Sequence, residues 1–534
     1  MKKTFKKALA TVLAATMLMP MAACGGGKNS GVNLEEDDMS KHVTLTFWTP
    51  IQSWAKGAVD TLADSDVYKE IEKKFNVTIK FTHPVAGQET TQFNLMINKN
   101  ELPDIISRAN WYQGGIQRGI DEGAYLDLTD LLQEHAPDYY NTIKSNVNIE
   151  RDVLTDEKKV GAFWGVSLYE EYPWYGPVLK QAWLDEAGLD VPETIADWEE
   201  VLTAFKDRGA EAPMIWNSSG IDPYGIFLSA YGVGNSWYVD YETKDVKYGP
   251  VQEGFYKYLE LMRDWYKKGL IDPNFSSTDW NKALEQITSG GSGAIMQSPD
   301  TMASYFDPKD IDWVAAPYPV LNEGDEIHYR QASSYASSAP NACAAISTSC
   351  ENPIRAMKVL NYGYTKEGAD LFNFGIKDRS YTEDAEGNKT FTDLVLNNPN
   401  YTVNQTVWRY KMHEGTFIRD EHKSNPVMST NAKSYAARES WGDIDASSVL
   451  PTFLTYTADE ERSFSDTMND FSSYAATQLL KFILGQENDL SSSSNPDLVN
   501  RNGKYQQEAA KLKLDDVAKV VQAAYDRYMA RVSE

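Results

Sequence analysis

The chain has 534 residues and a formal net charge of −26, with 51 Lys and Arg against 77 Asp and Glu. This acidity excludes a typical nucleic-acid or anionic-lipid binder, because both ligands require clustered Lys and Arg. The length predicts two or more domains with large apolar cores. With three Cys in the whole chain, disulfides cannot be the main support of such a fold.

The N-terminus has the three parts of a secretion signal: four lysines within residues 2–7, an apolar run over 8–19, and small residues before Cys24. We predict that residues 1–23 are a removed signal peptide. The sequence Met-Ala-Ala-Cys at 21–24 resembles a lipobox, which implies a lipid on Cys24; the alternative is an ordinary signal with a cysteine near its end. The Gly-rich, acidic residues 24–40 are then a flexible linker.

The body opens with alternating strand and helix patterns. Residues 43–47 and 77–81 alternate between apolar and polar side chains, as strands do, and Ser65 precedes a helical pattern between them. This connection is long enough for a parallel crossover. A second helix around 93–97 and a short strand at 105–106 follow. Such alternation predicts an α/β layered domain.

The pattern restarts after about residue 160. We expect a helix that begins at Thr194 and ends near Gly209, a longer helix ended by Gly269, a buried strand at 294–296, and Pro353 in the first turn of another helix. Residues 376–450 are polar and weakly periodic, which predicts an irregular insertion. Helices return near 465–484 and 515–531.

Several segments in a fixed order resemble one known family. They are the lipobox with its Gly-rich tether, Leu-Pro-Asp-Ile at 102–105, the block at 183–194, Ile-Thr-Ser-Gly at 287–290, Ala-Pro-Tyr-Pro at 316–319, Asn-Phe-Gly-Ile at 373–376 and Lys-Phe-Ile-Leu-Gly at 481–485. The chain resembles the family 1 extracellular solute-binding lipoproteins of bacterial carbohydrate ABC importers, above all those of Gram-positive bacteria.

The resemblance implies a two-lobe, periplasmic-binding-protein-like (type II) α/β fold with a helical C-terminal region. Lobe 1 is expected at 41–162 with part of 335–385, and lobe 2 at 163–334 with the C-terminal helices of 450–534. The chain would cross between lobes near 162–167 and 322–338. The irregular insertion at 376–450 would lie near the cleft.

The resemblance also implies a function without catalysis. The protein would capture a carbohydrate, by length and loop aromatics an oligosaccharide, close around it at a hinge, and deliver it to the transmembrane subunits of an ABC permease. It would be a lipid-anchored monomer on the extracellular face of the cytoplasmic membrane. Two alternatives remain: the same fold with a peptide or another small solute, and a secreted glycoside hydrolase, which needs only two suitably spaced carboxylates.

A sugar site combines flat aromatic rings, which cover C–H faces, with polar groups that bind hydroxyls. Because ligands bind beyond the carboxyl ends of strands in open α/β sheets, we selected residues in loops after predicted strands and beside the first crossing. These residues are Trp48, Trp54, Arg108, Asn110, Trp111, Glu171, Tyr172, Trp174, Tyr175, Trp216, Asn217, Trp237, Gln297 and Asp300. The competing interpretation is packing, since most of 14 Trp and 31 Tyr must fill cores.

The sequence has no His-Glu-x-x-His zinc pattern, no EF-hand loop, no complete phosphate loop and no Gly-x-Ser-x-Gly nucleophile turn. We therefore expect no cofactor and no metal, with a Ca²⁺ site of another pattern left open. Cys343 and Cys350 are either a small-loop disulfide or two free buried thiols.

Overall fold

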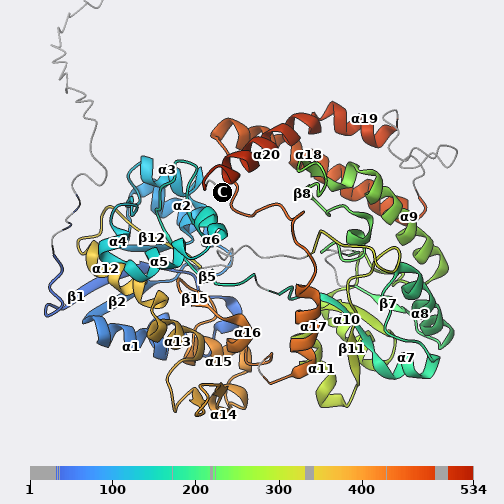
Figure 1. Cartoon of the computed structure of the whole chain (residues 1–534), viewed down its shortest axis with the longest axis horizontal. Coiled ribbons are helices and arrows are strands. Elements are labelled where there is room, and N and C mark those ends of the chain that lie inside the picture. Colours follow the sequence, from blue (N-terminus) through green and yellow to red (C-terminus); the bar gives the residue numbers. More distant parts are fainter. Residues whose placement is uncertain are drawn as a thin grey trace, which may run out of the picture.

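A computed structural model of the protein describes residues 32, 34, 36–170, 172–216, 221–222, 224–330, 342–428, 430–486 and 503–532, except the side chains of Trp54 and Glu421. The described residues form two α/β lobes, each built on its own sheet, with three C-terminal helices arranged along the second lobe (Figure 1). The expected signal peptide, Cys24 and most of the linker lie outside the described residues.

The first lobe contains a five-stranded sheet in the order β2-β1-β3-β12-β4. Its strands are β1 (Val43–Trp48), β2 (Val77–Thr82), β3 (Ile105–Ser107), β4 (Phe163–Trp164) and β12 (Cys343–Ile346). β1 is parallel to β2 and β3, whereas β12 is antiparallel to β3 and β4. The carboxyl ends of β1, β2 and β3 therefore meet at one edge, as the sequence pattern predicted for a parallel crossover.

The helices of the first lobe pack with this sheet and bury one continuous apolar core. They are α1 (Asp66–Phe75), α2 (Glu89–Lys99), α3 (Gly115–Asp121), α4 (Leu132–His135), α5 (Pro137–Lys144), α6 (Val147–Val153), α12 (Pro353–Asn361) and α13 (Lys366–Phe374). Pro353 occupies the first turn of α12, as expected. Ser65 precedes α1 but its side chain makes no capping bond to the helix.

The second lobe contains a four-stranded sheet in the order β11-β6-β10-β7 and a two-stranded hairpin. The strands are β6 (Gly176–Lys180), β7 (Met214–Ile215), β10 (Ala294–Gln297) and β11 (Trp313–Ala315), and the hairpin joins β8 (Trp237–Val239) to β9 (Val246–Tyr248). Its helices are α7 (Gln181–Ala187), α8 (Ile195–Asp207), α9 (Glu253–Lys268), α10 (Trp280–Ser289) and α11 (Pro299–Phe306).

Two helix ends in this lobe form as the sequence predicted. The Thr194 hydroxyl accepts a hydrogen bond from the Asp197 amide at 3.1 Å, and the Asp197 carboxylate accepts from the Thr194 amide at 2.8 Å. This reciprocal box satisfies two backbone donors at the start of α8. Gly269 ends α9 in the left-handed conformation, with φ of 68°.

The region 376–450, expected to be irregular, contains regular elements, so that expectation was wrong. They are β13 (Tyr381–Glu383), β14 (Lys389–Phe391), α14 (Asp393–Leu396), α15 (Val403–Tyr410), β15 (Ile418–Arg419), α16 (Glu421–Ser424) and α17 (Ala432–Gly442). The polar composition of this region gave no clear helical or strand pattern. Its two longer helices nevertheless each bury a Trp, Trp408 in α15 and Trp441 in α17.

Several segments connect the lobes. β5 (Val166–Ser167) pairs with β15, so the chain leaves the first lobe only after Ser167, and it crosses again between β15 and α17. α18 (Ala458–Ile483) packs against α9 of the second lobe, and α19 (Lys504–Lys511) and α20 (Leu514–Met529) follow it. The end of α20 returns to α6 of the first lobe (Figure 1).

Cys343 and Cys350 are both buried and both free thiols, which decides between the two states left open by the sequence. Burial raises the pKa of each thiol well above its ordinary value. In the part of the chain that the structure describes, no helix combines the length and apolarity needed to cross a bilayer.

Candidate ligand-binding site

The carboxyl edge of the first sheet carries three of the residues selected from the sequence. Trp48 ends β1 but is 4% exposed, and its ring packs edge-on against Phe93 with centroids 5.6 Å apart. Arg108 directly follows β3 in the left-handed conformation, with φ of 56°. This turn places the Arg108 guanidinium over the Trp111 ring, 4.3 Å from its centroid. Trp48 is thus buried beneath this edge of the sheet, whereas Arg108 and Trp111 lie nearer the protein surface.

Glu414 reaches the same edge from a distant part of the chain and was not predicted. Gln52 Nε2 donates to both of its carboxylate oxygens, at 3.3 and 3.4 Å. Burial raises the pKa of Glu414 to about 7, against the opposing effects of Gln52, Arg108 and Arg419. No local sequence pattern marks Glu414, because it lies between α15 and β15 and is brought here by tertiary packing.

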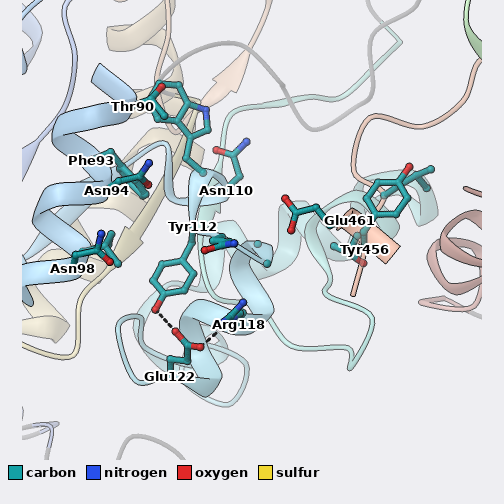
Figure 2. A pocket seen from close by; sticks show the side chains of 17 residues that line it. Thr90, Phe93, Asn94, Asn98, Asn110, Tyr112, Arg118, Glu122, Tyr456 and Glu461 are labelled. Atoms are coloured by element: carbon teal, nitrogen blue, oxygen red, sulfur yellow. Dashed lines mark hydrogen bonds and ion pairs between the residues drawn. The ribbon is translucent and has the colours of Figure 1, made fainter. Parts of the chain in front are cut away.

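A cavity of about 1130 Å³ opens beside this edge, between the first lobe and the start of α18. Asn110 and Trp111, both selected from the sequence, line it together with the exposed face of α2. Leu454 and Tyr456 form the opposite wall and pack against the apolar core of the second lobe. Figure 2 shows Asn110 and Glu461 facing each other across the space. The cavity therefore has one wall from each side of the molecule.

A hydrogen-bonded group closes one end of this cavity. The Tyr112 hydroxyl donates to Glu122 Oε2 at 2.7 Å, and Arg118 Nε donates to Glu122 Oε1 at 2.7 Å (Figure 2). Burial and the nearby Glu122 raise the pKa of Tyr112 to about 12, so the phenol remains a donor at neutral pH. Glu122 is thereby satisfied by two donors, and its charge is offset by Arg118.

Trp174 and Tyr175 lie where the first crossing enters the second lobe. Trp174 is 46% exposed and its ring contacts Tyr175 and Tyr224 edge-on, with centroids 5.3 and 5.4 Å apart. Tyr224, which the sequence did not indicate, packs on Tyr175 at 4.4 Å. A Trp held by two Tyr yet half open to solvent is a rigid platform of the kind that stacks on a sugar ring.

Gln297 and Asp300 lie at the carboxyl end of β10, as selected, but both have protein partners. Gln297 is 4% exposed and its Oε1 accepts from the Ser298 amide at 2.7 Å. Asp300 forms an ion pair with Arg438 of α17, and Asn425 Nδ2 donates to it at 3.4 Å. These contacts fasten the crossing between β15 and α17 to the second lobe, which favours a structural role for Asp300.

Tyr172 belongs to a separate aromatic cluster at the crossings. Its ring stacks on the His422 ring, with centroids 3.9 Å apart. The Tyr169 ring also contacts His422, with centroids 4.2 Å apart. The Tyr169 hydroxyl donates to Asp420 at 2.9 Å. Tyr172 does not line the cavity of Asn110 and Trp111.

Two selected tryptophans lie in the apolar core of the second lobe. Trp216 is 1% exposed beside Phe227, and Trp237 is 9% exposed between Tyr248 and Phe464. This placement favours packing over ligand contact. Glu171, Asn217 and the side chain of Trp54 lie outside the described residues. Among the described residues, no group of three or more His, Cys, Asp or Glu could hold a metal ion.

Residues 50–370, more than half of the chain, match the model of the family described as bacterial extracellular solute-binding protein. The chain belongs to this family. Members of the family bind solutes and are not enzymes, so the resemblance and the absence of catalysis predicted from the sequence are both confirmed.

Two curated relatives are similar to part of the chain. Lipoprotein LipO of Bacillus subtilis (strain 168) is 25% identical over 312 residues, 55% of this chain and 56% of LipO. The fructooligosaccharide ABC transporter substrate-binding protein FusA of Streptococcus pneumoniae serotype 4 is 23% identical over 320 residues, 53% of this chain and 55% of FusA. The chain thus spans about half the length of the curated relatives it matches.

A solved structure extends the likeness to almost the whole chain. The HMO binding, ABC-transporter-associated solute-binding protein of Bifidobacterium longum infantis superposes with a TM-score of 0.72 at 16% identity, covering 91% of this chain and 99% of that protein. At this identity the likeness defines the fold. It confirms the α/β solute-binding fold and the helical C-terminal region predicted from the sequence.

Proposed function

We propose that this protein is the substrate-binding component of an ABC importer and that it captures an oligosaccharide. The observation that carries this proposal is the cavity of about 1130 Å³, with the aromatic rings of Trp111 and Tyr456 beside the polar groups of Asn110 and Glu461. Rings and hydroxyl-binding groups side by side suit a carbohydrate. The similarity to the fructooligosaccharide transporter protein FusA and to the HMO binding protein supports the same ligand class.

Closure of the two lobes is the proposed mechanism. The Asn110 wall belongs to the first lobe and the Tyr456 wall packs with the second, so a ligand that contacts both walls binds the closed arrangement more tightly. Such differential affinity shifts the population toward the closed form. Transmembrane permease subunits would then recognise the paired lobe surfaces.

We further propose that the protein is anchored by a lipid on Cys24 and works as a monomer at the extracellular face of the membrane. The lipobox-like sequence at 21–24 supports this anchor, as does the similarity to LipO. Metabolic labelling of producing cells with a radioactive fatty acid tests it. The label should enter the protein and should be lost in the Cys24→Ser variant.

A binding screen tests the ligand class. The chain from residue 25 onward should gain thermal stability with one class of oligosaccharide and none with peptides, because saturation at a hundred times Kd adds about 2.7 kcal/mol. Asn110→Ala should weaken that ligand, whereas Asn281→Ala, an exposed Asn on α10 of the second lobe, should not. Responses to peptides alone would keep the fold and refute the carbohydrate. Release of shorter sugars from the oligosaccharide by pure protein would refute a binding function.

A further inference from the structure

One face of α2 gives the cavity a regular series of polar groups. Thr90, Asn94 and Asn98 follow each other at intervals of four residues, and all three line the cavity. At 1.5 Å of rise per residue, successive members are about 6 Å apart along the helix axis. Figure 2 shows them one above another on the α2 wall. The α2 side of the cavity therefore carries one hydrogen-bonding side chain about every helical turn.

These side chains are available to a ligand. All three side chains are exposed. Within the described part of the chain, no hydrogen bond joins the side-chain amide of Asn94 or Asn98 to another residue. Phe93 and Ile97 also line the cavity and place apolar surface between the amides. Exposed amides alone would also be found on an ordinary solvent-facing helix. Here, however, the α2 face lies across the cavity from Tyr456 and Glu461, as expected for a binding site.

The charges of the cavity indicate which ligands this wall accepts. Arg118 and Glu122 form an ion pair at 2.7 Å and offset each other. Glu461 lies opposite Asn110 and also interacts electrostatically with Arg118, so the lining holds two carboxylates and one cation. An anionic sugar would be repelled by this excess of carboxylate, whereas hydroxyl groups can bind both amides and carboxylates.

We propose that the cavity holds a linear, uncharged oligosaccharide whose successive units lie along α2 from Thr90 toward Asn98. This inference rests on the proposed function and specifies its ligand. Asn94 would bind a unit that short oligomers already contain. Asn98, one turn further from Thr90, would bind a unit that only longer oligomers supply. The length of the stripe thus determines how affinity grows with chain length.

Calorimetry with oligomers of increasing length tests this arrangement. The probes are malto-, cello- and fructo-oligosaccharides from disaccharide to hexasaccharide, and oligogalacturonates of the same lengths. The proteins are the chain from residue 25 onward and its Asn94→Ala, Asn98→Ala and Thr91→Ala variants. Thr91 is exposed on α2 but does not line the cavity, so Thr91→Ala is the matched control. Alanine favours helix at all these positions, so folding should be retained.

In the neutral series that binds, Asn94→Ala should weaken most lengths by about fivefold, the loss expected for one uncharged hydrogen bond. Asn98→Ala should leave the short oligomers unchanged and weaken only the longer ones by a similar factor. Oligogalacturonates should bind more weakly than neutral oligomers of equal length. An Asn98→Ala effect that is absent or equal at every length would overturn the arrangement along α2, and tighter binding of galacturonates would overturn the uncharged class. If no saccharide of any series bound even the unchanged protein, the proposed function itself would fail.

Discussion

The Tyr528 hydroxyl at the end of α20 donates a hydrogen bond to Asp152 Oδ1 of α6 at 2.6 Å, joining the C-terminal helices to the first lobe. Burial and the Asp152 carboxylate raise the pKa of Tyr528, so the phenol keeps its proton and remains the donor. Beside this bond, Arg531 Nε donates to Asp156 Oδ1 at 2.8 Å. The junction is therefore a contact between the first lobe and the C-terminal helices, which pack on the second lobe.

Tyr528→Phe removes the donor but keeps the ring. Because Asp152 is 4% exposed, losing a hydrogen bond to its charge should lower the free energy of unfolding by about 1.5–3 kcal/mol. Hydrogen exchange should also become faster in α20 than in α9. Tyr241→Phe is the control, since Tyr241 is 44% exposed and its hydroxyl makes no hydrogen bond to another described residue. Equal exchange in α20 of both variants would contradict a role for the Tyr528 bond.

Glu414 should make stability depend on pH. Its pKa is raised from an ordinary 4.5 to about 7, so between these values the folded protein holds a proton that the unfolded chain has lost. Stability from this group is therefore greatest below about pH 4.5, and it falls as the pH rises through 7, by at most about 3 kcal/mol. Urea unfolding at pH 5 and pH 8 should show this decrease for the unchanged protein. Glu414→Gln should reduce it, and Glu101→Gln, at an exposed position, should not.

Gly176 begins β6 directly after the first crossing and packs against Trp441. A Cβ at this position would lie 2.3 Å from Trp441 Cζ2, and Trp441 is fully buried, with Nε1 donating to the Ala316 carbonyl at 2.8 Å. Gly176→Ala should therefore cost about 1–3 kcal/mol or more through overpacking. Gly188→Ala, where a Cβ meets nothing within 4 Å, should cost only the strain of its left-handed φ, about 1–2 kcal/mol. Thermal unfolding of both variants provides the comparison.

Trp174 and Trp216 should respond differently to truncation. Trp216 is 1% exposed in the second core, so Trp216→Ala should lower stability by about 3–5 kcal/mol. Trp174 is 46% exposed, so Trp174→Ala should change stability by less than about 1 kcal/mol while weakening the saccharide that binds the unchanged protein. Paired denaturation and calorimetry distinguish the two. A large stability loss in Trp174→Ala without any loss of affinity would show that this ring packs and does not bind.

Arg355 clamps the segment that precedes β1. Its side chain is fully buried, its Nε donates to Asp37 at 2.8 Å, and its other nitrogens donate to the carbonyls of Phe75 and Asp38. Arg355→Ala leaves Asp37 with Lys358 alone and should cost about 3–5 kcal/mol. Proteolysis near residues 37–42 should become faster in this variant. It should remain slow in Arg462→Ala, whose partner lies on the exposed face of α18.

Local chemistry explains the parts of the fold that the sequence predicted. Period-2 alternation at 43–47 and the box at Thr194 depend on neighbours in the chain, and both appear as expected. The helices of 376–450 were missed because their stability comes from distant contacts. α17 contains few apolar residues. It is stabilised by Trp441, which packs against Gly176 at the start of β6, a segment distant in the sequence.

The candidate site shows the same limit. Asn110 and Trp111 could be selected because they directly follow β3, whereas Glu414 and Tyr456 reach the site from hundreds of residues away. Trp237 looked like a loop aromatic, and only its packing against Phe464 of α18 shows it to be core. Asn94 and Asn98 carry a four-residue spacing that places both amides on one side of α2, beside Phe93 and Ile97.

The clamp between Arg355 and Asp37 also determines how the protein bears mechanical load. A pull on the N-terminus reaches the body at Asp37 and passes through Arg355 into α12 and the end of α1. None of these residues lines the cavity or joins the two lobes. With the proposed anchor at Cys24, tension would therefore be carried within the first lobe, and the proposed closure of the second lobe would not work against it.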